Sequence, residues 1–247
     1  MSSIGLLLVF MPSLALATAP VEATRPAARE QIGCVLGEPI YRDQLRSDFS
    51  VREELFRLIS PALERYREEH RDEIEPTDAE LDFAASHIRQ QNPDKWRARD
   101  AERKKELAEI REIIADPDFQ NLPADEREFA TRRLRHLETS DAATDFARFI
   151  LNSRKFNRHL YHAFGGGLIV WQQAGVEAFD AHHRWLETLE ARGDFSITDP
   201  ELRKLLYEYW TNERMHGSFL STREKNPQAF EEFLNPAWFP AGPVEKP

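Results

Sequence analysis

Histidines and carboxylates in the second half of the chain have the types and spacing that could bind a metal ion. They occur three residues apart on predicted helices, as His159 and His162, Asp180 and His183, and Glu213 and His216. Carboxylate and histidine at this offset is the pattern that di-metal helical bundles use. However, a chain with eight histidines and 43 acidic residues produces about 1.4 carboxylate–histidine pairs at this offset by chance, and two are present. One hypothesis is therefore that these six residues bind a metal ion. The alternative is that the histidines are ordinary surface or helix-capping residues.

A glycine-rich apolar segment offers a second candidate site, for binding rather than catalysis. Residues 164–175 read FGGGLIVWQQAG between polar helices. Consecutive glycines let the backbone approach a ligand or another helix, an indole offers a stacking face, and amides donate and accept hydrogen bonds. The candidate binding residues are Gly165, Gly166, Gly167, Trp171, Gln172 and Gln173. The alternative is a helix stop that leads into a buried connector.

Catalytic chemistry has little support in the sequence. The glycines are not followed by Gly-Lys-Ser/Thr, so a phosphate-binding loop is not indicated. No Gly-x-Ser-x-Gly elbow is present, and Cys34 lies in a predicted strand, where a small buried apolar role is typical. We assign no catalytic residue and expect no cofactor, which leaves enzymatic activity open but favours binding.

The N-terminus and the composition predict where the protein works. An apolar run from Ile4 to Met11 is followed by Ala15-Leu16-Ala17, which fits a signal peptide cleaved before Thr18. No later apolar run is long enough to span a bilayer. The formal charge of −10 argues against nucleic acid and anionic lipid as partners, and a lone cysteine cannot form an internal disulfide. We therefore expect an exported, periplasmic protein.

The elements that would position these residues are mostly helices. Apolar residues follow helical spacing in 51–70, although Pro61 should kink or divide that helix. Capping boxes at Thr77–Glu80 and Thr198–Glu201 start two others, and Ser140 or Asp141 starts a long helix that ends at the three glycines. The strand candidates are residues 32–41 and 168–171. The expected fold is mainly α, with at most two or three short strands.

Two motifs near the N-terminus resemble one family. The stretch VLGEPI (residues 35–40) before a helix, and IEPTDAE (residues 74–80), resemble segments of SurA-like periplasmic foldase chaperones. The resemblance covers about residues 32–115 and implies a helical chaperone arm. Active members of that family also contain a parvulin prolyl-isomerase domain. Residues 85–88 and 165–171 imitate parvulin segments, but both lie in helical surroundings, so no isomerase activity is expected.

These observations divide the chain and give a leading hypothesis. The expected divisions are a signal peptide (1–17), a flexible lead (18–31), a SurA-like helical region (32–139), a C-terminal helical region (140–235) and a proline-rich tail (236–247). The leading hypothesis is a chaperone-like protein that binds unfolded polypeptide or an envelope protein without isomerase activity. The alternative is a periplasmic metal-binding protein or enzyme that uses the histidine and carboxylate residues.

Overall fold

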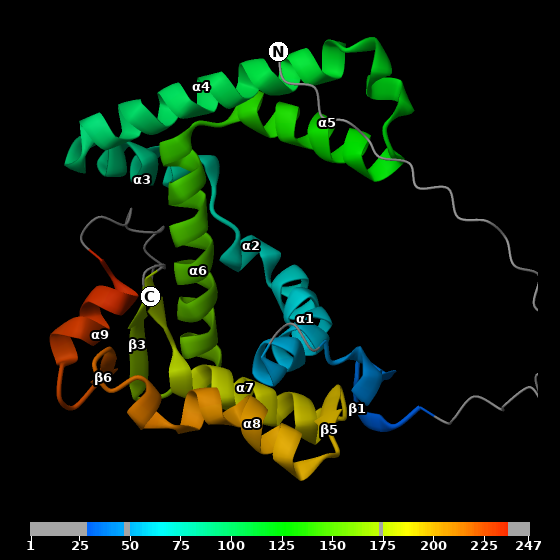
Figure 1. The fold of residues 1–247 in the computed structure, drawn as a ribbon. Coiled ribbons are helices and arrows are strands. Elements are labelled where there is room, and N and C mark those ends of the chain that lie inside the picture. The colour runs from blue at the N-terminus through cyan, green and yellow to red at the C-terminus, as the bar shows by residue number, and fades with distance from the viewer. Residues whose placement is uncertain (1–28, 47–49, 173–174, 237–247) are drawn as a thin grey trace, which may run out of the picture.

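A computed structural model describes residues 29–46, 50–172 and 175–236, and these residues are mainly helical (Figure 1). The helices are α1 (Val51–Glu69), α2 (Arg71–Ile74), α3 (Asp78–Gln91), α4 (Pro93–Ala115), α5 (Ala124–Thr139), α6 (Ala142–Phe164), α7 (Phe179–Arg192), α8 (Pro200–Thr211) and α9 (Pro227–Leu234). Short 3-10 turns are η1 (Arg42–Gln44), η2 (Pro117–Asn121) and η3 (Glu213–Met215). None of the described helices combines the length and the apolar content that crossing a bilayer requires.

Six short strands form two antiparallel sheets of three strands each, so the expectation of at most two or three strands is wrong. The strands are β1 (Gln31–Val35), β2 (Glu38–Tyr41), β3 (Leu168–Gln172), β4 (Gly175–Glu177), β5 (Phe195–Ile197) and β6 (Leu220–Thr222). Their orders are β2-β1-β5 and β4-β3-β6. Three of the strands contain only three residues, which is too short for an alternating pattern to be recognised.

Helix starts agree with the predicted caps in most places. The Thr77 hydroxyl accepts from the Glu80 amide at the start of α3, and Asp141 caps α6. The predicted cap at Thr198 is wrong by one residue, because the Asp199 carboxylate accepts the first free amides of α8. Pro61 lies inside α1, which runs on to Glu69, so the proline does not divide that helix.

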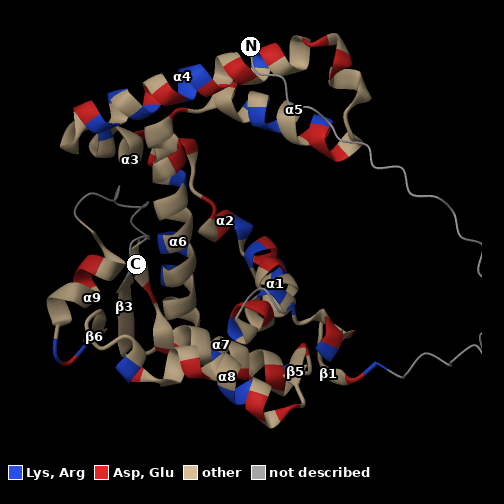
Figure 2. Cartoon of the chain, in the orientation of Figure 1, with Lys and Arg blue, Asp and Glu red and all other residues tan. Residues whose placement is uncertain are grey.

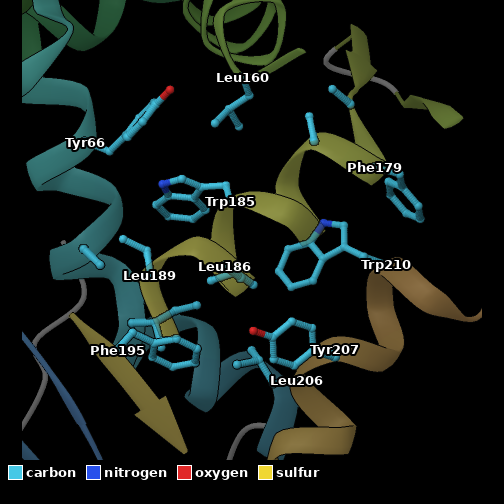
Figure 3. Close-up of a cluster of buried hydrophobic side chains, with 14 of the residues drawn as sticks. Tyr66, Leu160, Phe179, Trp185, Leu186, Leu189, Phe195, Leu206, Tyr207 and Trp210 are labelled. Carbon is cyan, nitrogen blue, oxygen red and sulfur yellow. The ribbon is translucent and has the colours of Figure 1, made fainter. Parts of the chain in front are cut away.

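Two separate groups of buried side chains hold the elements together, and α6 contributes to both. The small core contains Leu81, Ala84, Ala85, Trp96, Ala143, Ala147 and Leu151, from α3, α4 and α6. The large core, seen in part in Figure 3, joins the lower half of α6 to α1, α7, α8, α9 and both sheets. Alanines at the α3–α6 contact are small enough to let these two helices pack closely.

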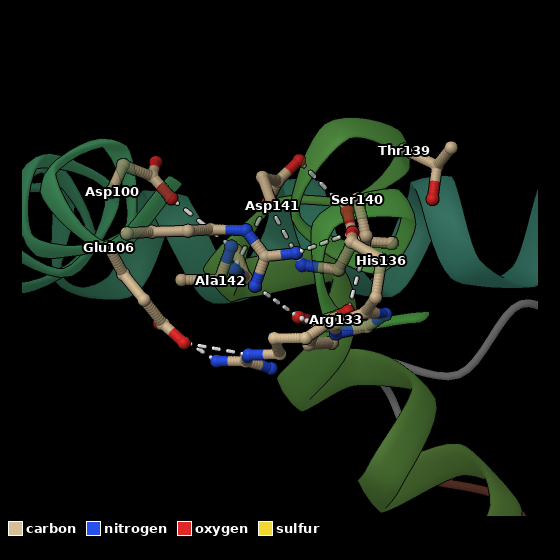
Figure 4. A network of polar contacts seen from close by, with 12 residues as sticks. Asp100, Glu106, Arg133, His136, Thr139, Ser140, Asp141 and Ala142 are labelled. Carbon is tan, nitrogen blue, oxygen red and sulfur yellow. Dashed lines mark hydrogen bonds and ion pairs between the residues drawn. The ribbon is translucent and has the colours of Figure 1, made fainter. Parts of the chain in front are cut away.

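An arm of two antiparallel helices, α4 and α5, crosses the end of α6 (Figure 1). Acidic and basic side chains alternate along both helices (Figure 2), and Trp96 is the one buried residue of α4. Besides the packing of Trp96, polar contacts hold the arm against α6 (Figure 4). Arg103 donates to the Asp145 carboxylate at 2.6 Å and to the His136 carbonyl at 2.8 Å, and the Asp100 carboxylate accepts from the Ala142 amide at 3.1 Å. The Arg103–Asp145 pair is largely shielded from water, so the attraction between its charges is screened less than in an exposed pair.

Packing also connects the two predicted regions on either side of residue 140. β1 pairs with β5, and Phe56 of α1 packs edge-on against Trp210 of α8, with ring centroids 5.1 Å apart. The predicted signal peptide, most of the predicted lead, and Trp238 and Phe239 of the tail lie outside the described residues. Within the described part of the lead, Arg29 pairs with Asp43 and Gln31 begins β1.

The β1–β5 pairing depends on the absence of a side chain at Gly33. A Cβ atom at this position would lie 2.1 Å from the Ser196 carbonyl oxygen and 3.2 Å from the Ile197 Cα, and neither backbone atom can move away cheaply. We therefore expect Gly33→Ala to lower the free energy of unfolding by at least about 2 kcal/mol. Urea denaturation followed by circular dichroism measures this loss.

Gly37→Ala is the matched control, since Gly37 lies in the β1–β2 turn at φ +84° and a Cβ there would meet no atom within 4 Å. Its cost is limited to backbone strain, about 1 kcal/mol. If Gly33→Ala is no less stable than Gly37→Ala, the close approach of β1 to β5 is contradicted.

Candidate functional site

A pocket of about 440 Å³ lies between α1, α6, β4 and the start of α7. Its volume is in the range of ligand-binding pockets. The lining residues are Leu63, Arg67, Phe149, Asn152, Ser153, Phe156, Asn157, Gly175, Val176, Glu177 and His182. The α6 members recur at intervals of three and four residues and so occupy one face of that helix. The pocket therefore combines one helix face with one short strand.

The apolar part of the pocket consists of Leu63, Phe149, Phe156 and Val176. Phe156 is buried, and the Arg67 guanidinium lies 4.7 Å from its ring centroid, which is a cation–π contact. Phe149 is 56% exposed, so its ring presents apolar surface to the solvent beside the buried Phe156. The pocket thus has a buried aromatic floor and an exposed aromatic rim.

A buried asparagine ties β4 to α6. The Asn157 Oδ1 accepts from the Ala178 amide at 2.9 Å, and its Nδ2 donates to the Ser153 carbonyl at 2.9 Å. Asn157 is almost fully buried, so both bonds satisfy groups that would otherwise be costly to desolvate. This side chain fixes the wall of the pocket where β4 leads into α7.

Aromatic side chains of α8 support the same wall through contacts with Glu177 and His182. Glu177 accepts from the Tyr209 hydroxyl at 2.9 Å and from the Trp210 Nε1 at 3.3 Å. The His182 Nδ1 donates to the Ala178 carbonyl at 3.1 Å, and its ring stacks on Trp210 with centroids 5.9 Å apart. Burial lowers the pKa of His182, so its imidazole is neutral at pH 7. The arrangement offers hydrogen bonds and apolar surface, and no activated nucleophile is among the lining residues.

The predicted glycine site is a close packing of backbone against α7. Gly165 ends α6 at φ +69°, and a Cβ at Gly166 would lie 2.6 Å from the Asp180 Cβ. The Asp180 carboxylate accepts from the amides of Gly167 and Leu168, at 2.8 and 3.1 Å. The metal candidate Asp180 therefore caps the connector that follows α6.

The other residues of the predicted binding segment lie along β3. The Trp171 Nε1 donates to the Ser221 hydroxyl of β6 at 3.2 Å, and Gln172 pairs with Gly175 through its backbone. The side chain of Gln172 and the whole of Gln173 lie outside the described residues. The predicted glycines and Trp171 do not line the pocket, and the segment reaches it only at its far end, through Gly175.

The six residues of the predicted metal site do not form one ligand group, and most of them contact different neighbours. His183 faces Glu187 at 3.7 Å, and the His216 Nε2 lies 3.1 Å from the Tyr209 carbonyl. His162 packs against the Tyr161 ring, and Glu213 begins η3. His159 alone joins a possible ligand group, described below.

Within the described residues, one group of three side chains could hold a metal ion, and it consists of His70, Glu73 and His159. The sequence prediction missed His70 and Glu73. A signal was present, because these two residues also lie three apart, but with the histidine before the carboxylate. The pocket residues Asn157 and His182 were missed as well, and only a polar residue on an otherwise apolar helix face could have indicated them.

We expect the protein to lose stability as the pH falls from about 7 towards 5. The pKa of buried His182 is lowered in the folded state, whereas an unfolded histidine titrates near 6.5. At pH values between these two pKa values, the unfolded chain binds more protons at this residue than the folded protein does. The stabilisation that neutral His182 provides is therefore complete above pH 6.5 and is lost as the pH falls through the folded-state pKa. In His182→Phe, which keeps an aromatic ring but does not titrate, this loss should be smaller. Urea denaturation at several pH values measures it, and an unchanged pH dependence would contradict the assignment.

Comparisons with protein-family models, curated proteins and solved structures find no match to this chain. The resemblance to SurA-like chaperones therefore stays a prediction from two short motifs.

Proposed function

We propose that this chain is an exported, periplasmic, chaperone-like protein that binds extended segments of unfolded polypeptide and has no isomerase activity. The pocket between α1, α6 and β4 would be the binding site. The observation that carries the proposal is the exposed Phe149 at the rim of a partly apolar pocket beside a sheet edge. A protein that holds unfolded clients needs such exposed apolar surface.

The type of ligand follows from the lining. β4 is an edge strand with β3 as its one neighbour in the sheet, and extended polypeptides commonly bind at edge strands. Leu63, Phe156 and Val176 suit an apolar side chain of the client, while Asn152 and Ser153 can bond to its backbone. Arg67 and Glu177 have opposite charges, so the pocket does not select one sign of ligand charge.

Other features agree with a binding role without isomerisation. Residues 85–88, which imitate a parvulin strand in sequence, lie within helix α3. The highly charged α4–α5 arm keeps both signs of charge along its surface (Figure 2), which favours solubility while a client is bound. An exposed segment of an envelope protein could occupy the same pocket, and it is the alternative source of the bound polypeptide.

We expect Phe149→Ala to weaken the binding of an unfolded client at least about fivefold, because truncating an aromatic side chain that contacts a bound polypeptide costs about 1 kcal/mol or more. Fluorescence anisotropy with a labelled, permanently unfolded polypeptide measures the affinity. Suppression of client aggregation, measured by light scattering, should fall in parallel.

Phe129→Ala is the matched control. Phe129 is 62% exposed on α5 and lies outside the pocket lining, so its loss should leave client affinity unchanged. Equal losses in both variants would indicate nonspecific adhesion and would contradict the pocket as the site. Acceleration of prolyl isomerisation in a proline-containing peptide would contradict the noncatalytic part of the proposal.

A further inference from the structure

A group of metal-ligating side chains lies where α1 turns into α2 and meets α6. His70 ends α1, Glu73 lies on α2, and His159 comes from the last third of α6. The His159 Nδ1 is 3.2 Å from one Glu73 carboxylate oxygen, and the His70 Nδ1 is 3.9 Å from the other. One ligand atom from each residue lies within 4.8 Å of the other two. Both imidazoles therefore face the same carboxylate.

The surroundings of this group are aromatic and incompletely hydrogen-bonded. The Tyr66 ring packs against both imidazoles, with centroids 4.6 Å from His70 and 5.6 Å from His159. The His159 Nε2 and the Tyr66 hydroxyl are buried and have no hydrogen-bond partner among the described residues. Figure 3 shows Tyr66 at the edge of the large core, with its hydroxyl directed away from Trp185.

We propose that His70, Glu73 and His159 bind a single divalent transition-metal ion, with Zn²⁺ as the best match. Two imidazoles and one carboxylate form a ligand set that zinc proteins use, and a water molecule would complete four-coordination on the exposed side. Hard cations such as Mg²⁺ and Ca²⁺ prefer oxygen ligands and fit this set poorly.

The present geometry needs only a small contraction to coordinate an ion. Zinc–ligand distances of about 2.0–2.1 Å place tetrahedral ligand atoms roughly 3.3 Å apart. The His159–Glu73 distance already has this value, and because all three ligand atoms lie within 4.8 Å of one another, the other two distances must shorten by at most about 1.5 Å. Glu73 is 67% exposed on a helix of four residues, so its side chain can adjust.

Charge and protonation also favour a cation here. Burial, followed by the proximity of His70, lowers the pKa of His159, and a neutral imidazole is the form that ligates metals. Burial and the charge of Glu73 raise the pKa of Tyr66 to about 12, so the phenol beside the two imidazoles stays protonated at neutral pH. Coordination through Nδ1 uses the neutral tautomer of His159 that carries its proton on Nε2.

A bound ion would fix the elbow between the two cores. α2 connects α1 of the large core to α3 of the small core, and Lys155, one turn before His159, already donates to the Glu75 carbonyl at 2.9 Å and to the Glu80 carboxylate. The ion would add a second link between α6 and the same elbow.

Competition between the untagged full-length chain and a chromophoric Zn²⁺ chelator tests the proposal. We expect one Zn²⁺ per chain, and at least about tenfold weaker binding in His70→Gln and in Glu73→Gln. Both residues are at the surface, so these variants should fold even if His159→Gln does not. At a hundredfold excess over Kd, Zn²⁺ should also raise the melting temperature by roughly 5 °C or more.

His183→Gln is the matched control, because His183 and Glu187 form a histidine–carboxylate pair that lacks a third ligand. This variant should bind Zn²⁺ with unchanged affinity. The proposal is overturned if the wild-type chain binds no Zn²⁺ at micromolar concentration. It is overturned equally if the double variant His70→Gln, Glu73→Gln binds as tightly as the wild type.

Discussion

The burial of α6 at both of its ends is the constraint on which the rest of the structure depends. Among the described residues, this helix alone contributes to both groups of buried side chains, through Ala143, Ala147 and Leu151 at one end and Phe156 and Leu160 at the other. The α4–α5 arm consequently shares its buried apolar group with α6 and has no separate core. Because the small core contains mainly alanine and leucine side chains, it buries little apolar area, and polar contacts such as Arg103–Asp145 must supply the remaining orientation of the arm.

Much of the helical layout could be predicted because its signals are local. The Thr77 capping box, the Asp141 cap and the glycine stop after Phe164 each act within one helical turn, and each lies where the sequence indicates. The strands β4, β5 and β6 could not be predicted in this way, since their partners supply their stability. Gly33 faces Ile197 across a separation of more than 160 residues, and no short-range pattern records that pairing.

The same difference, between patterns within one helix and contacts between residues far apart in the sequence, applies to the candidate sites. Sequence spacing marked His159 as a residue that could ligate a metal, but it grouped His159 with His162 of the same helix and with His183 and His216. The structure instead brings it to His70 and Glu73, which only the folding of α1 and α2 against α6 can achieve. The sequence marked the glycine segment because glycines let the backbone approach another group closely. In the structure that group is the Asp180 side chain of α7 and not a ligand.

The pocket and the proposed metal site share one interface, and this links the two proposals. Leu63 and Arg67 of α1 line the pocket, while Tyr66 and His70 of the same helix face His159. Large side chains separate α1 from α6. The centroid of the Tyr66 ring lies 5.6 Å from that of His159 and 6.2 Å from that of Phe156. An ion that draws His70 towards α6 would therefore also bring Leu63 and Arg67 of α1 closer to α6 and so narrow the pocket. If that movement changes the affinity for a polypeptide, the polypeptide must change the affinity for the ion by the same factor, because the two binding free energies are coupled through one conformational equilibrium.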